Sequence, residues 1–475
     1  MALSKKKETI FTQEEKLAQA LVPVEEQLYP LPGNWCWIRQ SAICDLSDGE
    51  KCSGESFPYW EVKALRGLKE IQYATEGKFV SKGTKVILVD GENSGEIFDI
   101  PDDGFMGSTF KSLSISASVN WDYLRFFIVT QKELYRNNKK GSAIPHLNKK
   151  LFFNMPFPLA PFAEQQRIVD RIERLFTKLD EAYEKVREVV ENFETRKLAI
   201  LSKAFSGEFT SKWRNSHAPS SVGAADACRQ TAQQWTKKEQ RLLAAEQDKI
   251  CFEAKGNGHM WMICTIGAVA RISNGSTPSR SVDAYWNGDI PWVSSGEVKN
   301  NIIFETAEKI TQTGFENTSV KLLPIGTVLI AMIGEGKTRG QSAILQIPAT
   351  TNQNVAAIII DSHHIESKYL WYWLQMNYAK NREIGGGSGP QALNCQRVRE
   401  LDFKLPSIVE QTEIVRILDD LLAKEQSAKE AAEGVLEQID LIKKAILARA
   451  FRGELGTNDP NEESAVELLK QISSC

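Results

Sequence analysis

Apolar residues recur at alternating steps of four and three along two long stretches of the chain, residues 164–205 and 410–451. A period of 3.5 residues is typical of a coiled-coil seam, and Glu, Lys and Arg fill the intervening positions, as solvated positions require. Glu425 interrupts the second seam once, and Gly207 and Gly453 are natural helix stops. The predicted seam residues of the two long helices are Ile168, Ile172, Leu175, Leu179, Val186, Phe193, Ile414, Leu418, Leu421, Val435, Ile439 and Ile446.

The two stretches are copies of one another. An offset of 246 residues superimposes them without a gap and places Phe205 on Phe451. The segments before them repeat more weakly, with Trp35 on Trp261, and the drift of the offset there indicates insertions in loops. This repeat indicates a duplication of one globular unit followed by one helix. Matched registers favour pairing of the helices with each other; two unrelated helices with partners elsewhere are the alternative.

The globular units mix short β-type runs, at 85–89, 326–333 and 355–361, with helical stretches such as 366–381. Glycine and polar turns separate these runs, which predicts α+β domains. The predicted segments are an N-terminal arm (1–30), a first globular domain (31–160), a central helix (161–208), a connector with a helix (209–260), a second globular domain (261–405), a distal helix (406–455) and a C-terminal tail (456–475).

Composition narrows the class of protein. With 475 residues, 42% hydrophobic and 25% charged, the chain reads as a soluble protein of two to four domains. It has neither an apolar run of about 18 residues nor a secretory signal, so we expect a cytoplasmic protein. None of its eight cysteines forms a Cys-x-x-Cys pair, so no metal site is expected. The net charge of −3 means that any surface for nucleic acid must be locally basic.

Two motifs suggest catalysis. Residues 331–338 match a relaxed phosphate-loop pattern, but the chain continues in β-like fashion where a phosphate loop opens a helix. Asp289, Glu297 and Lys299 have the rough spacing of a metal-dependent nuclease, a pattern that is common by chance. A stand-alone nucleotide-binding or nuclease enzyme is therefore one alternative. A polar loop between strands that approaches DNA, or an ordinary solvated hairpin, are the other interpretations of 331–338.

The chain resembles the DNA-specificity subunits of type I restriction–modification systems. The resemblance rests on EQ(Q/T)xIV at the start and AF(S/R)GE(F/L) at the end of each long helix. It also rests on the openings LPGNW and WMICTIGAVARISNGSTPSR and on the segments PYWEVK and IPWVSSGEVK. It covers essentially residues 31–470.

This resemblance implies that the globular units are target-recognition domains and that the helices are spacers paired antiparallel. Two methyltransferase subunits, which carry S-adenosylmethionine, and motor-nuclease subunits are the implied partners besides double-stranded DNA. Catalysis lies in those partners, and this chain holds no cofactor. An antiparallel pair of repeated helices, each roughly 60 Å long, gives the chain an approximate two-fold axis. Because the two domains differ in sequence, the expected DNA site is asymmetric and interrupted. An adaptor that joins proteins without reading sequence is a further alternative.

Polar and basic loop residues are the candidates for phosphate and base contacts. The flexible segment 385–391 is a further loop that the resemblance places near DNA, with a simple turn as the alternative. The candidates are Lys63, Arg66, Lys69, Asn93, Ser94, Ser108, Thr109, Lys111, Ser276, Thr277, Ser279, Arg280, Ser294, Ser295, Lys299, Lys337, Thr338 and Arg339.

Overall fold

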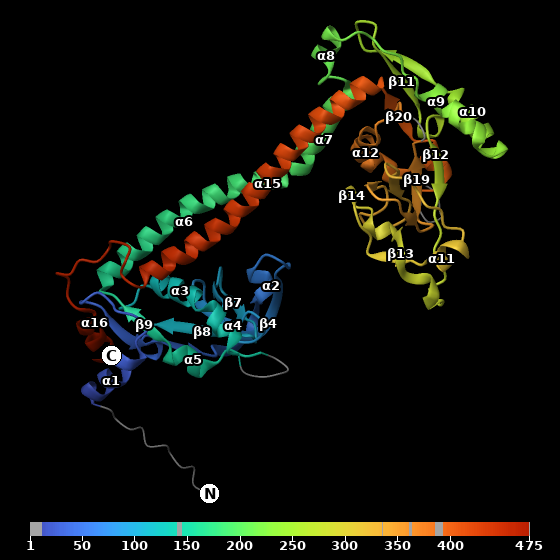
Figure 1. Ribbon diagram of the computed structural model, residues 1–475. Helices are drawn as coiled ribbons and strands as arrows, with labels where there is room; N and C mark the ends of the chain where they lie inside the picture. The colour runs from blue at the N-terminus through green and yellow to red at the C-terminus, as the bar shows by residue number, and fades with distance from the viewer. Residues whose placement is uncertain (1–11, 140–144, 335, 361–362, 385–392, 475) are drawn as a thin grey trace. The chain divides into compact units, whose positions relative to one another are not determined.

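The computed structural model describes residues 12–139, 145–334, 336–360, 363–384 and 393–474. The chain divides into two compact units (Figure 1). Unit 1 consists of Met1–Glu188 and Glu433–Cys475, and unit 2 of Val189–Ala432. Unit 1 is therefore built from two separate stretches of sequence, whereas unit 2 is continuous.

Unit 1 contains a four-stranded sheet in the order β2-β8-β5-β6, a two-stranded sheet β1-β9 and a closed arrangement of β3, β4 and β7. The strands are β1 (Cys36–Arg39), β2 (Cys44–Ser47), β3 (Glu50–Trp60), β4 (Gln72–Val80), β5 (Lys85–Leu88), β6 (Ile97–Asp99), β7 (Gly104–Met106), β8 (Phe110–Ile115) and β9 (Pro156–Leu159). The helices are α1 (Gln13–Ala20), α2 (Val62–Leu65), α3 (Trp121–Thr130), α4 (Lys132–Asn137), α5 (Lys149–Asn154) and α16 (Ala465–Ser474), with most of α6 (Phe162–Glu191).

Unit 2 contains sheets in the orders β12-β19-β16-β17-β14, β10-β11-β20 and β15-β13-β18. The strands are β10 (Cys251–Ala254), β11 (Met260–Thr265), β12 (Arg271–Asn274), β13 (Trp286–Val293), β14 (Asn301–Ile303), β15 (Glu308–Ile310), β16 (Val328–Ala331), β17 (Ser342–Leu345), β18 (Thr350–Thr351), β19 (Val355–Ile359) and β20 (Asp402–Leu405). The helices are α7 (Phe193–Ser206), α8 (Ser211–Ser216), α9 (Ala224–Thr231), α10 (Lys237–Gln247), α11 (Gln312–Glu316), α12 (Ser367–Met376), α13 (Tyr378–Glu383) and α14 (Cys395–Arg399). Helix α15 (Ile408–Ala450) begins in unit 2 and ends in unit 1.

The two units share one strand plan. The order β2-β8-β5-β6 in unit 1 corresponds to β12-β19-β16-β17 in unit 2. The registers correspond too, because Leu46 pairs with Leu113 in unit 1 as Ile272 pairs with Ile358 in unit 2. Each unit also contains a parallel strand pair outside this sheet. The pair is β3 with β7 in unit 1 and β13 with β18 in unit 2. The duplication in the sequence is therefore also a duplication of mixed helix-and-strand topology.

The predicted helix over 164–205 is interrupted. Helix α6 ends at Glu191, and α7 begins at Phe193 after Asn192, whose ψ of 2° departs from helical values. Asn is a weaker helix former than the Ala, Leu, Glu and Lys that are common in this segment, and its side chain makes no capping hydrogen bond to α7. At the other end Gly207 has a φ of +84° and caps α7 as predicted. The distal helix α15 is continuous over 43 residues.

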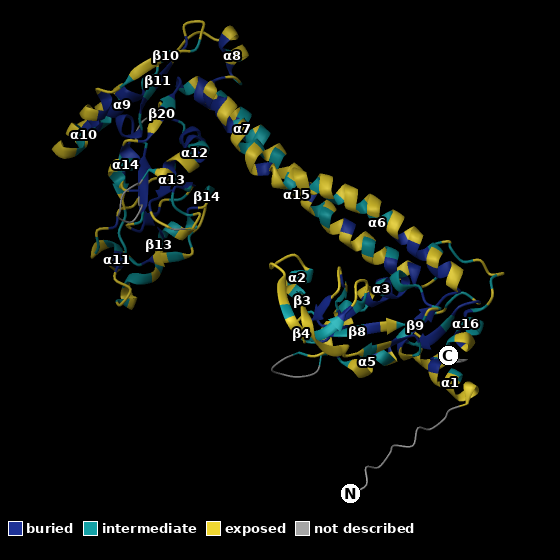
Figure 2. Ribbon diagram, turned by 180° about the vertical axis from the view of Figure 1, so that it is seen from behind, coloured by how far each residue is buried: buried dark blue, intermediate teal, exposed yellow. Residues whose placement is uncertain are grey.

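Most predicted seam residues are at least half-buried, while much of the remaining surface of α6 is exposed (Figure 2). In unit 1 Ile168 and Ile172 belong to the same core cluster as Leu447. In unit 2 Leu201 shares a core cluster with Ile414. The seam differs from the prediction at one place, where Val435 is 39% exposed and Leu436 takes the inward position. The 4-3 spacing admits either residue, and packing decides between them.

Candidate nucleic-acid interface

Three loops of unit 1 meet at one edge of its strands. The first follows β3 and contains α2, the second joins β5 to β6, and the third joins β7 to β8. The N–H of Gly107 donates to the carbonyl of Trp60 at 3.0 Å, and the N–H of Val89 donates to the carbonyl of Thr109 at 2.9 Å. An ion pair between Arg66 and Glu96 ties the first loop to the second. The backbone itself therefore gathers these loops.

Unit 2 repeats this edge with its own loops. The N–H of Asn352 donates to the carbonyl of Val293, and the N–H of Met332 donates to the carbonyl of Asn354, at 3.0 and 2.9 Å. A fourth segment, 276–280, joins the edge because the N–H of Ser276 donates to the carbonyl of Thr351 at 2.9 Å. Gly275 permits this approach: a Cβ there would lie 1.9 Å from the carbonyl oxygen of Thr351.

Most of the candidate residues of unit 1 lie on its loop edge. Lys63, Arg66 and Lys69 are exposed on and after α2, and Ser108 is exposed between β7 and β8. Asn93 and Thr109 are half-buried in the same loops. The prediction that Ser94 contacts DNA is wrong, because its side chain is fully buried. Ser94 lies in the turn between β5 and β6, where its N–H donates to the carbonyl of Gly91 at 3.2 Å, and the conformation of this turn buries its side chain.

Lys111 lies on β8 and is engaged with a carboxylate. Its Nζ forms an ion pair with Asp48, which also accepts a bond of 2.6 Å from Nζ of Lys78. The two lysines lower the pKa of Asp48 to about 2, with Lys111 the larger influence. A phosphate that binds Lys111 must therefore compete with Asp48, so Lys111 is a weaker candidate than the exposed Lys63.

In unit 2 the candidate arginine Arg280 is held by two kinds of contact. Its guanidinium pairs with both carboxylate oxygens of Glu308, one bond measuring 2.8 Å. It also lies over Trp286, 3.7 Å from the ring centroid. The hydrogen bond from Arg280 lowers the pKa of Glu308. Bidentate pairing and stacking together hold the guanidinium in a defined direction. A base that binds Arg280 must compete with Glu308, as a phosphate must compete with Asp48 for Lys111.

The remaining candidates of unit 2 occupy three loops. Ser276, Thr277 and Ser279 precede β13, and Thr277 bonds to Gln353. Ser294, Ser295 and Lys299 follow β13, and Lys337, Thr338 and Arg339 lie between β16 and β17. Lys299 and Lys337 are exposed. The glycine-rich segment 385–391 lies outside the described residues.

The relaxed phosphate-loop motif is part of a hairpin. Strand β16 pairs antiparallel with β17, and the N–H of Gly340 donates to the carbonyl of Ala331 at 2.9 Å. The residues after the motif thus form a strand, as the sequence indicates, and not the helix whose N-terminus binds phosphate in a true phosphate loop. This geometry disfavours nucleotide binding.

Glu297, the candidate nuclease acid, has a structural role. Its Oε2 accepts from the N–H of Ser294 at 2.8 Å, and its Oε1 accepts from the N–H of Ala307 at 2.9 Å. Both oxygens therefore hold loop backbone. Within the described ranges, no group of three or more His, Cys, Asp or Glu residues is arranged to hold a metal ion.

Some residues at the edge of unit 2 had no clear signal in the sequence. Asn300, with a φ of +55°, uses its Oδ1 to accept from the N–H of Ser342 at 3.1 Å, which joins two loops. Arg382 of α13 bonds to the carbonyl of Gly336. Only the TTNQN turn at 350–354 had a readable pattern, and it supplies Gln353.

The fold is that of known specificity subunits. A solved structure concerned with complex assembly and conformational transition of the type I R-M system contains a similar chain, with a TM-score of 0.65 and 17% identity over 90% of this chain and 100% of that one. The HsdS subunit from Thermoanaerobacter tengcongensis is similar with a TM-score of 0.56 and 17% identity over 91% and 100%.

Specificity subunits of several type I restriction enzymes are similar to this chain in sequence. The MjaIX specificity subunit of Methanocaldococcus jannaschii is 30% identical over 37% of this chain and 41% of its own length. The EcoR124I/EcoR124II specificity subunit of Escherichia coli is 27% identical over 38% and 45%. The chain thus spans less than half the length of these two relatives. The MjaVIII subunit of M. jannaschii is 22% identical over 85% of this chain and 87% of its own length.

The family described as "Type I restriction modification DNA specificity domain" matches residues 38–192 and 259–437, one region in each copy of the repeat. The chain belongs to this family, and the resemblance seen in the sequence is confirmed. In the part of the chain that the structure describes, no helix is both long and apolar enough to span a bilayer.

Proposed function

We propose that this chain is the DNA-specificity subunit of a type I restriction–modification complex. It binds one asymmetric, interrupted DNA site through two target-recognition domains, residues 31–160 and 261–405. It carries out no catalysis itself; two methyltransferase subunits that bind S-adenosylmethionine, and motor-nuclease subunits, supply the chemistry in the cytoplasm. The observation that carries the proposal is that a member of this family has the same loop-bearing strand edge twice, with different side chains on each copy.

We further propose that the helices α6–α7 and α15 pair antiparallel as a coiled coil with an approximate two-fold axis. Contacts within each unit support this. Asp180 forms an ion pair with Lys443 in unit 1, and Arg196 with Glu425 in unit 2, the latter at 2.8 Å. From the first ion pair to the second, the residue number rises from 180 to 196 on α6–α7 and falls from 443 to 425 on α15. This is the pattern of an antiparallel pair. The ion pair also explains why Glu425 can stand in the apolar seam.

The proposed DNA contacts are the loop-edge residues of both units. Exposed lysines and arginines contact phosphates, and the polar side chains of the loops read base edges. Ser94 is omitted because it is buried. The proposed set is Lys63, Arg66, Lys69, Asn93, Ser108, Thr109, Lys111, Ser276, Thr277, Ser279, Arg280, Ser294, Ser295, Lys299, Lys337, Thr338 and Arg339.

A library of DNA duplexes, bound to the chain assembled with its methyltransferase subunit, tests the proposal. We expect selection of one interrupted sequence above a salt-sensitive non-specific background. Lys63→Ala and Lys337→Ala should each reduce the slope of log K against log salt by about 0.9 if each lysine neutralises one phosphate. Lys237→Ala, at an exposed lysine of α10, is the matched control. Equal affinity for all sequences refutes the proposal.

Exchange of one domain separates sequence reading from simple adaptor function. Residues 261–405 are replaced by the corresponding domain of another family member. Half of the selected sequence should change while the other half stays the same. An unchanged site, or a site that changes in both halves, contradicts the assignment of one half-site to each domain.

A further inference from the structure

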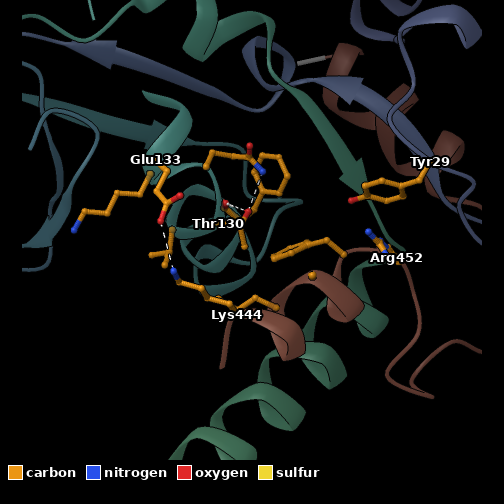
Figure 3. Close-up of a pocket in the computed structure, with 12 residues that line it drawn as sticks. Tyr29, Thr130, Glu133, Lys444 and Arg452 are labelled. Carbon is orange, nitrogen blue, oxygen red and sulfur yellow. Dashed lines mark hydrogen bonds and ion pairs between the residues drawn. The ribbon is translucent and has the colours of Figure 1, made fainter. Parts of the chain in front are cut away.

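Unit 1 contains a cavity of about 470 Å³ between α3–α4 and the last turns of α15 (Figure 3). Phe127, Leu447 and Phe451 contribute buried apolar surface to it, and Val129 on its wall is 50% exposed. The Phe127 and Phe451 rings meet edge to face at 5.3 Å, which makes a rigid floor. No contact described above for DNA uses this cavity.

Cations surround the opening. Lys132, Lys444 and Arg452 line the cavity together with a single acid, Glu133. The ion pair of Lys444 with Glu133 is long, at 3.5 Å, and both side chains are more than two-thirds exposed. Arg452 lies over the ring of Tyr29, 5.4 Å from its centroid. The rim therefore has an excess of positive charge over an apolar floor.

The apolar surface continues beyond the cavity along both helices. Leu441 of α15 is 63% exposed and lies three residues before Lys444, on the same helical face. Leu134 of α4 is 40% exposed. A small ligand would fill the cavity and leave these side chains in water. An extended apolar strip of this kind is typical of a surface that a protein covers.

The cationic rim is a property of unit 1 alone. The repeat offset of 246 places Lys132 on Tyr378, Lys444 on Leu198 and Arg452 on Ser206. The aromatic floor, in contrast, recurs in unit 2, where Phe205 meets Trp373 at 5.2 Å. The aromatic floor thus belongs to both copies of the duplicated fold, whereas these three cations are present in one copy only.

We propose that this groove is a docking site for an amphipathic helix of the methyltransferase subunit whose apolar side chains are flanked by carboxylates. A groove between helices accepts side chains at helical spacing, and the positive rim selects the acidic flanks. DNA does not fit, because phosphates gain nothing from an apolar floor. Unit 1 therefore holds its partner by a charge-dependent contact that unit 2 lacks. This inference rests on the proposed function, because that function supplies the partner.

Charge reversal at the rim tests the inference. The triple variant Lys132→Glu, Lys444→Glu, Arg452→Glu should bind the purified methyltransferase subunit about tenfold or more weakly at low salt, with the difference shrinking at high salt. Lys212→Glu, Lys237→Glu, Lys238→Glu is the control, because it makes the same change of charge at exposed lysines of α8 and α10. An equal effect in both variants refutes the inference.

Crosslinking identifies the occupant. A photoreactive benzoylphenylalanine at Leu441 should crosslink to a methyltransferase segment with apolar residues beside Asp or Glu. The same group at Thr195, the exposed counterpart of Leu441 in unit 2, should not crosslink to that segment in a salt-dependent way. Crosslinks to a second copy of this chain, or the absence of crosslinks in an assembled complex, overturn the inference. Dodecanoate serves as a probe for a small apolar ligand. Its stoichiometric binding also overturns the inference if the methyltransferase subunit fails to displace it.

The two proposals fail in distinguishable ways. If the wild-type chain assembles and selects its DNA site but the rim variant binds the methyltransferase subunit equally well, only the docking site is wrong. If the wild-type chain neither assembles nor selects a site, the proposed function is wrong.

Discussion

The indole Nε1 of Trp35 donates a hydrogen bond of 2.7 Å to Oε2 of Glu164, although 129 positions separate the two residues. In unit 2 Trp261 makes the same bond to Glu410, at 3.0 Å. Both carboxylates are buried and stand at the start of a long helix. Each helix is thereby anchored to the first segment of its own globular domain.

The two glutamates differ in their other partners, which predicts different costs of removal. Glu410 also pairs with the buried Arg214 at 2.6 Å, whereas Glu164 accepts from the neutral Asn458 at 2.8 Å. Glu410→Ala leaves a buried cation unpaired and should destabilise unit 2 by about 3–5 kcal/mol. Glu164→Ala leaves neutral donors and should cost unit 1 about 1–3 kcal/mol. Hydrogen exchange resolved by unit measures both; a larger effect for Glu164→Ala contradicts this explanation.

Gly434 lies inside α15 and gives a stabilising substitution. A Cβ at this position meets no atom within 4 Å, and the φ is not in the left-handed region. Gly434→Ala should therefore stabilise the helix by roughly 0.5–1 kcal/mol, because glycine loses more backbone entropy than alanine on folding. Thermal unfolding checks this. Gly207→Ala is the opposite control: its φ is +84°, and its Cβ would lie 3.2 Å from the Trp261 ring, so it should destabilise.

Cysteine reactivity should follow burial. Burial raises the pKa of the Cys264 thiol to about 12, and that of Cys44 to about 12 as well. Cys52 and Cys251 are exposed. Since the thiolate is the reactive form, iodoacetamide at about pH 8 should modify Cys52 and Cys251 well before Cys264 and Cys44. Peptide mass spectrometry measures the order, and equal rates in the native protein would falsify it.

Asp48 predicts a pH dependence in the acid range. Lys111 and Lys78 lower its pKa from 3.8 to about 2, so the folded state favours the ionised form. The stabilising contribution is present above the unfolded value of 3.8 and is lost as the pH falls through about 2. In Lys111→Met the NMR-detected pKa of Asp48 should move back toward 3.8. An unchanged titration would show that Lys111 does not set it.

The sequence predicts the long helices because a heptad pattern extends over many turns and averages out local irregularities. The local exceptions escape it. The break at Asn192 depends on the backbone conformation of one residue, and the choice of Leu436 over Val435 depends on packing. The sequence bears on strand order only through the internal repeat. A strand as short as β18 has too few residues to show an alternating pattern of apolar and polar positions.

The candidate interface is predictable as a set of loops but not as a set of side chains. Glycine and polar residues mark the loops, and most marked residues lie where the strands end. Burial of Ser94 and capture of Arg280 by Glu308 follow from three-dimensional contacts between distant segments. The EQ pairs that open each helix were recognisable as a motif, but their bonds to Trp35 and Trp261 were not.

The division of the chain has a consequence for synthesis on the ribosome. Unit 2 is continuous, so all of its residues have been translated when position 432 is reached. Unit 1 at that moment still lacks Leu447, Ala450 and Phe451, which complete its core cluster. The N-terminal part of unit 1 therefore leaves an apolar face exposed to solvent while unit 2 folds. Nascent unit 1 is thus the part on which chaperones should act.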